Sequence, residues 1–561
     1  LSLVLNAGSV QNGAAATDDQ PAVIAGQALT NDQAMSSTGS VTASVLDNQI
    51  LSYVGDDVGA AVVDTDDNEM SASATGNEAD NTIALAFNAL EGTISGAGTG
   101  VVAATANEQT LGNNSRITAR NVGLSGVPIF TQVGSDAGDE QPGASVSTSG
   151  NTVSVSANGN VTTGNDVIVD ATNITSGSEA DPSITTAGVL TATGSFVSAS
   201  TQTSGADILA SQNNTGGTLS NRIVTAFGDD IQDQSTVVSD DNVLSAVATA
   251  NSASNSVQLG DAETATVAAS GVTANYQSTS AEGSVSAVIG IAGTEAIAGF
   301  TSLNGATTPS TPSDIDYSSG TGTLTVTLNP VTVVFDSALT AEEALVLTNL
   351  GWTASSGSAT VVIPVGTYNI TGSLSSISVN DPSPGGGADT DETITIAGFN
   401  AAPVAGSLNG AGVLVEIDGG NSGSISNSTV SVSANTVVGE VTGNTAVNSA
   451  AAIATAIDGL GSAATVSNVT NTTTTDPDGA DLATTNVQVS DAPLSSDVYA
   501  VFGIVARDGL GGSITDSSQT VSENLQQSYA TANRATNSVD LTATNSSADA
   551  VLDSVQFSNA S

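Results

Sequence analysis

The chain has 561 residues, with five arginines, no lysine, histidine or cysteine, and a formal net charge of −50 from its 55 acidic residues. Because enzymes draw most nucleophiles, general bases and metal ligands from histidine, cysteine and lysine, this composition argues against an enzyme. It also argues against nucleic acid as a partner, because binding phosphates needs basic side chains.

Small side chains dominate the apolar part of the composition. Apolar residues make up 39% of the chain and aromatic residues only 3%, which favours thin, closely stacked sheets over a thick globular core. No run of about 18 apolar residues occurs, so we expect no membrane insertion. The chain starts at Leu1 rather than methionine, and we interpret it as a mature secreted chain, extracellular or on the cell surface, whose signal has been removed.

The first ten residues, LSLVLNAGSV, predict a β-strand followed by a polar loop. We expect this strand to be the first strand of its own sheet. The alternative is that it docks onto the open edge of a neighbouring subunit and adds a strand there.

A degenerate repeat runs through both ends of the chain. Three segments fit the pattern N-x8-N-x3-N-[ST]-[VI]-x-L without a gap: 68–85, 242–259 and 524–541. A fourth copy, which starts at Asn435, keeps the asparagine spacing and relaxes the tail. The heptapeptide TVSVSAN occurs at both 152–158 and 429–435, and Asn48, Asn68 and Asn88 are spaced by 20 residues.

The repeat predicts an all-β fold. Segments such as VLSAVATA (243–250) alternate apolar and polar residues, as strands do, and asparagine tolerates the backbone conformations of turns. A stacked strand–turn–strand unit of about 20 residues is typical of a β-solenoid, in which equivalent asparagines can stack as amide ladders. The competing interpretation is an elongated β-sandwich array, in which the units are antiparallel hairpins.

A different segment, 286–410, interrupts the repeat region. It contains seven of the 13 prolines and the only tryptophan, Trp352, and its strand runs are more strongly apolar. We interpret it as an inserted β-sandwich module of immunoglobulin-like kind with Trp352 in its core. The predicted domains are therefore an N-terminal repeat region (1–285), the module (286–410) and a C-terminal repeat region (411–561).

Clusters of acidic residues in predicted loops are candidates for a Ca²⁺ site, because calcium takes six to eight hard oxygen ligands. The stretch that begins at Asp476 comes closest, with alternating aspartates and a glycine, although it lacks the frame of an EF-hand. The alternative is a solvated acidic loop. The candidate ligands are Asp64, Asp66, Asp67, Asp389, Asp391, Glu392, Asp476, Asp478 and Asp481.

The asparagine-punctuated repeat, with no lysine or cysteine, resembles bacterial exported β-strand-repeat surface proteins: filaments, sheaths, S-layer-like proteins and large adhesins. The resemblance implies an extracellular scaffold and calcium, and it assigns a role to no individual residue. We expect a structural protein that polymerises with copies of itself through β edges into a filament, sheath or surface layer. The alternative is an adhesin, or a phage or virion fibre, that binds a glycan or a cell-surface partner through the 286–410 module.

Overall fold

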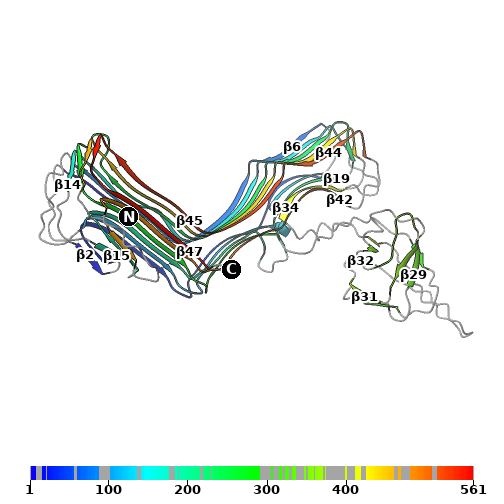
Figure 1. Ribbon diagram of the computed structural model, residues 1–561. Coiled ribbons are helices and arrows are strands. Elements are labelled where there is room, and N and C mark those ends of the chain that lie inside the picture. Colours follow the sequence, from blue (N-terminus) through cyan, green and yellow to red (C-terminus); the bar gives the residue numbers. More distant parts are fainter. Residues whose placement is uncertain are drawn as a thin grey trace, which may run out of the picture.

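The structure is a computed structural model in which the protein is all-β, with parallel sheets stacked beside one another (Figure 1). Among the residues described, no helix is long and apolar enough to cross a membrane. The described residues are 2–7, 16–19, 22–55, 60–87, 101–134, 140–175, 183–186, 189–214, 219–228, 230–290, short segments between 305 and 400, 411–418, 425–459, 465–468, 480–507 and 514–559.

One turn of the chain runs through five principal strands: β7 (Glu69–Phe87), β8 (Val101–Leu111), β9 (Arg116–Gly123), β10 (Ile129–Val133) and β12 (Ser145–Ser149). The chain then returns to its start, because β13 (Thr152–Ala171) pairs in parallel with β7 from Thr152 opposite Glu69. Asn151 follows Asn68 by 83 residues, and Asn242 follows Asn151 by 91. Successive turns therefore lie directly on one another.

Five parallel sheets result from this path, and each takes one strand from each turn. The long-strand sheet contains β1 (Ser2–Ala7), β7, β13, β22 (Val243–Leu259), β37 (Thr436–Ile453) and β45 (Leu525–Thr542). The return sheet contains β3 (Ala22–Met35), β8, β17 (Phe196–Ser204), β24 (Gly271–Thr279), β40 (Leu482–Ser490) and β47 (Ala550–Ser558).

The other three principal sheets have five strands each. They are the β4–β41 sheet, with β4 (Ser40–Asn48), β9, β18 (Asp207–Ser211), β25 (Ser284–Ile289) and β41 (Leu494–Val498); the β5–β42 sheet, with β5 (Ile50–Val54), β10, β19 (Arg222–Gly228), β34 (Ala411–Asp418) and β42 (Ala500–Arg507); and the β6–β44 sheet, with β6 (Val62–Asp66), β12, β21 (Thr236–Asp240), β36 (Thr429–Ser433) and β44 (Ser518–Ser522).

Short strands occupy the tips of the turns. Two small parallel sheets are formed by β11 (Glu140–Pro142), β20 (Asp230–Gln232), β35 (Ile425–Ser426) and β43 (Ile514–Thr515), and by β14 (Asn173–Thr175), β23 (Thr266–Ala268), β38 (Ala456–Ile457) and β46 (Asn545–Ser546). Antiparallel additions to the return sheet are β2 (Ala16–Asp19), β15 (Ser183–Thr186), β16 (Leu190–Thr193) and β39 (Thr465–Asn468), and a 3-10 helix, η1, spans Leu124–Gly126.

The stacked turns form two thin arms that meet at an angle (Figure 1). In the first arm the long-strand sheet covers the return sheet, and Ile83, Val167 and Val257 pack between them. In the second arm the β6–β44 sheet covers the β5–β42 sheet, with Val146 and Val237 in the core. Alternate residues of β22 are buried on both sides of Ala250 and Asn251, which are themselves both buried, so the small apolar side chains of the repeat form the filling between two layers.

Parallel, in-register pairing rules out antiparallel hairpins for these strands. The predicted 20-residue unit is wrong: the chain repeats after 83 to 91 residues, and after 193 residues in the turn that contains the segment between β25 and β34. The two TVSVSAN copies do not occupy equivalent places, since 152–158 lies in β13 and 429–433 forms β36. The physical reason is that every sheet uses the same alternation of small residues, so strands of different sheets look alike in sequence.

The N-terminal strand lies on its own chain. β1 extends the long-strand sheet in parallel, with Ser2 opposite Thr82 and Ala7 opposite Phe87. The expectation that it is the first strand of its own sheet is confirmed.

The segment between β25 and β34 enters the stack at one link between sheets. This link joins the β4–β41 sheet to the β5–β42 sheet, and in two other turns it is a single residue, Gln49 or Tyr499. Trp352 is buried, as predicted, and meets Tyr368 edge-on with ring centroids 6.2 Å apart. Two antiparallel sheets are described here, β26–β29–β30 (Gly305–Thr307, Val331–Phe335, Thr360–Ile363) and β27–β28–β31 (Ile315–Ser318, Thr323–Val326, Gly366–Asn369), with a pair of β32 (Ser373–Leu374) and β33 (Phe399–Asn400).

Candidate functional site: amide ladders and two open ends

A ladder of asparagines lies where the β6–β44 sheet bends into the long-strand sheet. The Nδ2 of each asparagine donates to the Oδ1 of its equivalent in the next turn, over distances of 2.9 to 3.0 Å, from Asn68 through Asn151, Asn242 and Asn435 to Asn524. The same Oδ1 also accepts the backbone N–H of the asparagine before it, for example Asn242 N–H to Asn435 at 3.0 Å. We call this the elbow ladder.

The elbow ladder repairs a break in the backbone pairing. The residue before each asparagine has a positive φ of 52° to 66°, which turns the chain out of the pleat. These residues are Asp67, Gly150, Asp241, Ala434 and Glu523. The side-chain carbonyl then supplies the acceptor that the interrupted strand lacks, because a buried backbone N–H needs a partner.

A second asparagine ladder and a glutamine ladder clasp the two layers of the first arm. Asn77, Asn160, Asn251, Asn444 and Asn533 are linked at 2.7 to 2.8 Å, and each also donates to a backbone carbonyl of the return sheet. The glutamine ladder joins Gln33, Gln109, Gln202, Gln277, Gln488 and Gln556, also at 2.7 to 2.8 Å.

The two ladders of the clasp are reciprocal. Asn251 donates to the carbonyl of Ser278, which directly follows Gln277, and Gln202 donates to the carbonyl of Ser252, which directly follows Asn251. Each side-chain amide therefore uses one N–H along the stack and one N–H across it. This pattern satisfies buried polar groups between the layers and fixes the register of both.

Two further asparagine rows are incomplete. Asn165, Asn255, Asn448 and Asn537 are linked at 2.8 to 3.2 Å, while Asn81, although opposite Asn165 in register, has both side-chain polar atoms buried without a partner among the described residues. The strand register shifts between Thr162 and Gly164, where β13 has an extra residue. In the return sheet, Asn31 donates to Asn107 and Asn275 to Asn486, both at 2.8 Å.

The ladders have a direction. In the elbow ladder and in the second asparagine ladder, Nδ2 donates toward the C-terminal turns. In the glutamine ladder Nε2 donates toward the N-terminal turns, as from Gln202 to Gln109. In each amide, one N–H donates along the ladder and the second N–H donates to a backbone carbonyl. That carbonyl fixes which side-chain atom is the nitrogen, and so it fixes the direction of the ladder.

Both ends of the stack are open strand edges. β3, β4, β5 and β6 are the outermost strands at one end, and β41, β42, β44, β45 and β47 at the other. β1 is the outermost described strand of the long-strand sheet at the first end, and β2 covers the outer edge of β3 from Ala22 to Ala25. The last turn also exposes large apolar side chains: Val521, Leu525, Tyr529, Leu552 and Phe557.

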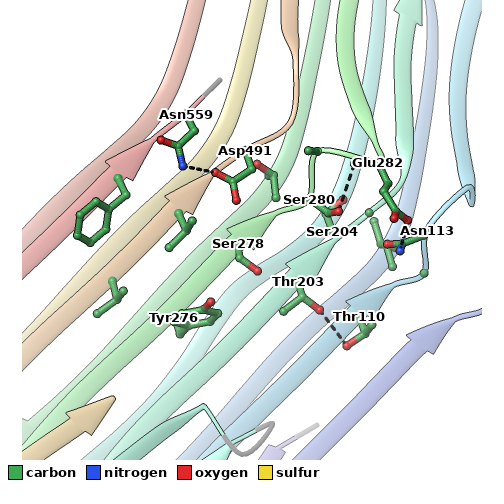
Figure 2. Close-up of a pocket in the computed structure, with 18 residues that line it drawn as sticks. Thr110, Asn113, Thr203, Ser204, Tyr276, Ser278, Ser280, Glu282, Asp491 and Asn559 are labelled. Carbon is green, nitrogen blue, oxygen red and sulfur yellow. Dashed lines mark hydrogen bonds between the residues drawn. The ribbon is translucent and has the colours of Figure 1, made fainter. Parts of the chain in front are cut away.

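A groove of 790 Å³ lies on the outer face of the return sheet, where its strands end (Figure 2). Tyr276 and Phe557 line it together with hydroxyl side chains such as Thr110 and Thr203, which are 3.2 Å apart. Asp491 and Asn559 close one side through a hydrogen bond of 3.0 Å. The lining contains no basic residue, and Asn113 donates to Glu282 across it.

The predicted calcium ligands are spread out. Asp64 and Asp66 are on the exposed side of β6. Partial burial of its carboxyl, together with the Asp66 carboxylate, raises the pKa of Asp64. Asp66 accepts from Ser147 Oγ and Ser149 N, each at 3.1 Å, and Asp67 occupies the positive-φ elbow position. Asp481 is buried and accepts the N–H of Asp549 at 2.9 Å. The others, Asp389, Asp391, Glu392, Asp476 and Asp478, lie outside the described residues.

Within the described part of the chain, no group of three or more acidic side chains is placed to hold a metal ion.

The asparagine rows were visible in the repeat pattern, and the glutamine row was missed. Its signal is [NS]-x-Q, which each return-sheet strand carries at 31–33, 107–109, 200–202, 275–277, 486–488 and 554–556, although the same pattern also occurs elsewhere, for example at 256–258 and 524–526. Asn151, Asn160 and Asn165 escaped the gapless pattern because of the extra residue in β13.

The comparisons with known proteins add no name to this arrangement. No family model, no curated protein and no solved structure matches the chain.

Proposed function

We propose that this chain is an extracellular structural protein, a β-solenoid subunit that assembles with copies of itself into a filament, sheath or surface layer. It performs no reaction in this proposal. The observation that carries the proposal is the pair of open ends: among the described residues, each of the five principal sheets ends on both sides of the stack at a strand edge that is unpaired, except where β2 covers Ala22 to Ala25 of β3. Unpaired backbone N–H and C=O groups along an edge are a template for another strand.

The edge strand β47 lacks two common kinds of protection against such pairing. Soluble proteins blunt their edges with lysine, proline or bulges. β47 (AVLDSVQFS) contains neither lysine nor proline, and Leu552 and Phe557 are 51% and 46% exposed. Burying such side chains against another subunit is favourable by about 25 cal/mol per Å² of apolar area.

The ladders favour a mechanical role. Each amide row links every turn to the next through side chains as well as through the backbone, so a stack resists slippage of one turn against another. The described interior between the layers offers bonded amides and small apolar groups.

The charge suggests how assembly is controlled. A net charge of −50 makes copies repel one another. Salt or divalent cations screen this repulsion, so that at 0.1 M ionic strength exposed charges more than about 10 Å apart hardly interact. Calcium is part of the proposal through the acidic stretch of sequence from Asp476 to Asp481, because its aspartates are the hard ligands that calcium prefers.

The test is electron microscopy of the purified chain across a NaCl series, with CaCl₂ or a chelator added. We expect ordered polymers with a strand spacing of about 4.8 Å along the long axis, favoured by salt and by calcium. Isolated particles under all these conditions would count against the structural role. Polymers whose formation is unchanged by the chelator would count against calcium alone.

The second candidate function is adhesion through the 286–410 module. The observation that favours it is the insertion of more than 100 residues at a link that is one residue long in two other turns, with β29, β31 and β32 lying away from the stacked arms (Figure 1). Projecting segments on a rigid scaffold commonly carry recognition. A glycan array probed with the full chain, and with a variant in which 291–410 is replaced by a short linker, tests it.

A further inference from the structure

The contact between two subunits of the polymer, here called the joint, can be identified if the proposed self-assembly holds. We infer that subunits join head to tail through the first arm alone: β47 of one subunit pairs in parallel with β3 of the next, and the end of β45 pairs with β1. Gln556 then meets Gln33 of the following copy and continues the glutamine ladder.

The strand count selects this arm. The return sheet and the long-strand sheet contain six stacked turns, because β1 and β3 begin the chain before the first complete turn and β45 and β47 end it after the last. The β4–β41, β5–β42 and β6–β44 sheets contain five. The two ends of the chain thus overlap by one layer in the first arm.

This overlap prevents a rigid copy from continuing all sheets at once. If β4 of the next copy were placed directly on β41, its β3, one link earlier in the same turn, would need the place that β47 already occupies. If instead β3 is placed on β47, the five-stranded sheets face each other one strand layer apart, about 5 Å further than in a continuous sheet. The first arm is therefore the only one that can make strand-to-strand contact.

The free edge of β3 has the length and register of β47. Ala25 pairs with β8 on one side and with Ala16 of β2 on the other, so β2 covers the outer edge of β3 as far as Ala25. The pairings from β3 through β8, β17, β24 and β40 place Ala550 on the row of Gln27 and Ser558 on the row of Met35. The nine residues of β47 thus match the stretch that β2 leaves open.

The side chains on these rows are complementary. The Nε2 of Gln33 donates to the carbonyl of Glu78 at 2.8 Å and has a second N–H, while the Oε1 of Gln556 is the last acceptor of its ladder. The Leu552 side chain falls on the row of Leu29, and the two acidic side chains, Asp32 and Asp553, fall on different rows. A tail-to-tail contact would instead bring two Gln556 carbonyl oxygens together.

Cysteine cross-linking tests the joint, because the chain has no cysteine of its own. Ala34 and Phe557 are exposed, and they fall on the same row of the predicted joint. Within one chain five strand spacings, about 24 Å, separate them, so a disulfide can form only between subunits. The test variant is Ala34→Cys with Phe557→Cys.

The matched control is Ala34→Cys with Ala550→Cys. Both are exposed and both lie on the same strands, but seven residues, about 23 Å, separate their rows. After mild oxidation of assembled protein, we expect a ladder of covalent oligomers on a non-reducing gel from the test pair and none from the control.

Polymers by microscopy without cross-links in the test pair would overturn this joint and leave the proposed function standing. Covalent dimers from Phe557→Cys alone would indicate a tail-to-tail contact and would also overturn it. If the unmodified chain forms no polymer, both the joint and the proposed function fall.

Discussion

The Nδ2 of Asn151 lies 3.0 Å from the Oδ1 of Asn242, although 91 residues separate the two in the chain. The same Oδ1 accepts the backbone N–H of Asn151 at 3.2 Å. One side chain thus holds the next turn in place and completes the backbone pairing at the elbow. Asparagine fits this role because its amide combines an acceptor and two donors on a short, stiff side chain.

We expect Asn251→Ala to destabilise the protein strongly. The substitution removes the bonds to Asn160, Asn444 and the Ser278 carbonyl, all at 2.8 to 2.9 Å in a buried row. Leaving buried polar groups without partners costs roughly 1–3 kcal/mol each, so a loss of at least about 2 kcal/mol is expected. Urea unfolding monitored by circular dichroism measures it.

The control for that variant is Asn158→Ala on β13. Asn158 is half-buried, and its Nδ2 donates to Ser156 Oγ two residues away. We expect its free energy of unfolding to stay within about 0.5 kcal/mol of the parent's, as for ordinary surface substitutions. Equal losses in both variants would contradict a special role for the ladder.

Gln202→Glu is expected to make stability depend on pH. A carboxylate at this position has no N–H for Gln109 Oε1 or for the Ser252 carbonyl, which now accept at 2.7 and 2.8 Å. Burial and facing oxygens raise the folded-state pKa of the introduced carboxyl above its unfolded value, so the variant is closest to the parent at low pH and loses stability as pH rises through that folded pKa.

Thermal unfolding at pH 4 and pH 8 checks this expectation. Gln132→Glu, on the half-buried outer side of β10 where Nε2 donates to the nearby Gly134 carbonyl, is the control. Similar pH profiles for the two variants would argue against a buried, directional glutamine ladder.

We expect Asp166→Asn to stabilise the protein at neutral pH. Burial and the neighbouring Asp80 raise the pKa of Asp166, partly offset by the Ser256 hydroxyl, which donates to its carboxylate at 2.6 Å. Because the folded pKa lies above the unfolded one, Asp166 costs no stability below the unfolded pKa and destabilises the fold as pH rises through the folded pKa.

The melting temperature of Asp166→Asn should therefore exceed that of the parent at pH 7, and the difference should vanish at pH 3. Asp170→Asn, an exposed site on the same strand, serves as the comparison. A gain that persists unchanged at pH 3 would refute the electrostatic explanation.

The elbow position offers a paired test of backbone strain. Ala434 has φ 56°, where an alanine is strained by about 1–2 kcal/mol and glycine is not, and Gly150 holds the equivalent place with φ 66°. After the entropic cost of glycine, Ala434→Gly should gain about 0.5–1 kcal/mol. Gly150→Ala should lose more, since its Cβ would also meet the Asp67 carboxylate.

Differential scanning calorimetry of the two single variants compares them directly. Destabilisation by Ala434→Gly would show that the left-handed backbone does not strain the alanine at this elbow position.

Several features follow from the sequence because they depend on short-range pattern. The alternation in 243–250 predicts a strand whose alternate residues are buried, and β22 has this pattern along its length. The spacing of Asn242, Asn251 and Asn255 predicts equivalent positions in successive turns, and all three lie in amide rows. Trp352, the single tryptophan of a segment richer in proline, is buried.

The length of the turn could not be predicted in the same way. A strand of alternating small residues carries almost no information about which sheet it joins, so the identical heptapeptides at 152–158 and 429–435 begin strands of different sheets. The extra residue in β13 displaced Asn165 from the pattern, and only the register of the neighbouring strands brings it opposite Asn81.

Composition and local pattern by themselves determined that this chain is all-β, acidic and built on recurring asparagines, because strand propensity, charge and turn chemistry are properties of neighbouring residues. Only the tertiary structure decided that turns of 83 to 91 residues, and one of 193, stack in parallel, that Gln33 and Gln556 begin and end one row, and that one arm has a strand layer more than the other. Those facts depend on where the chain closes each turn, which is set by packing between residues far apart in sequence.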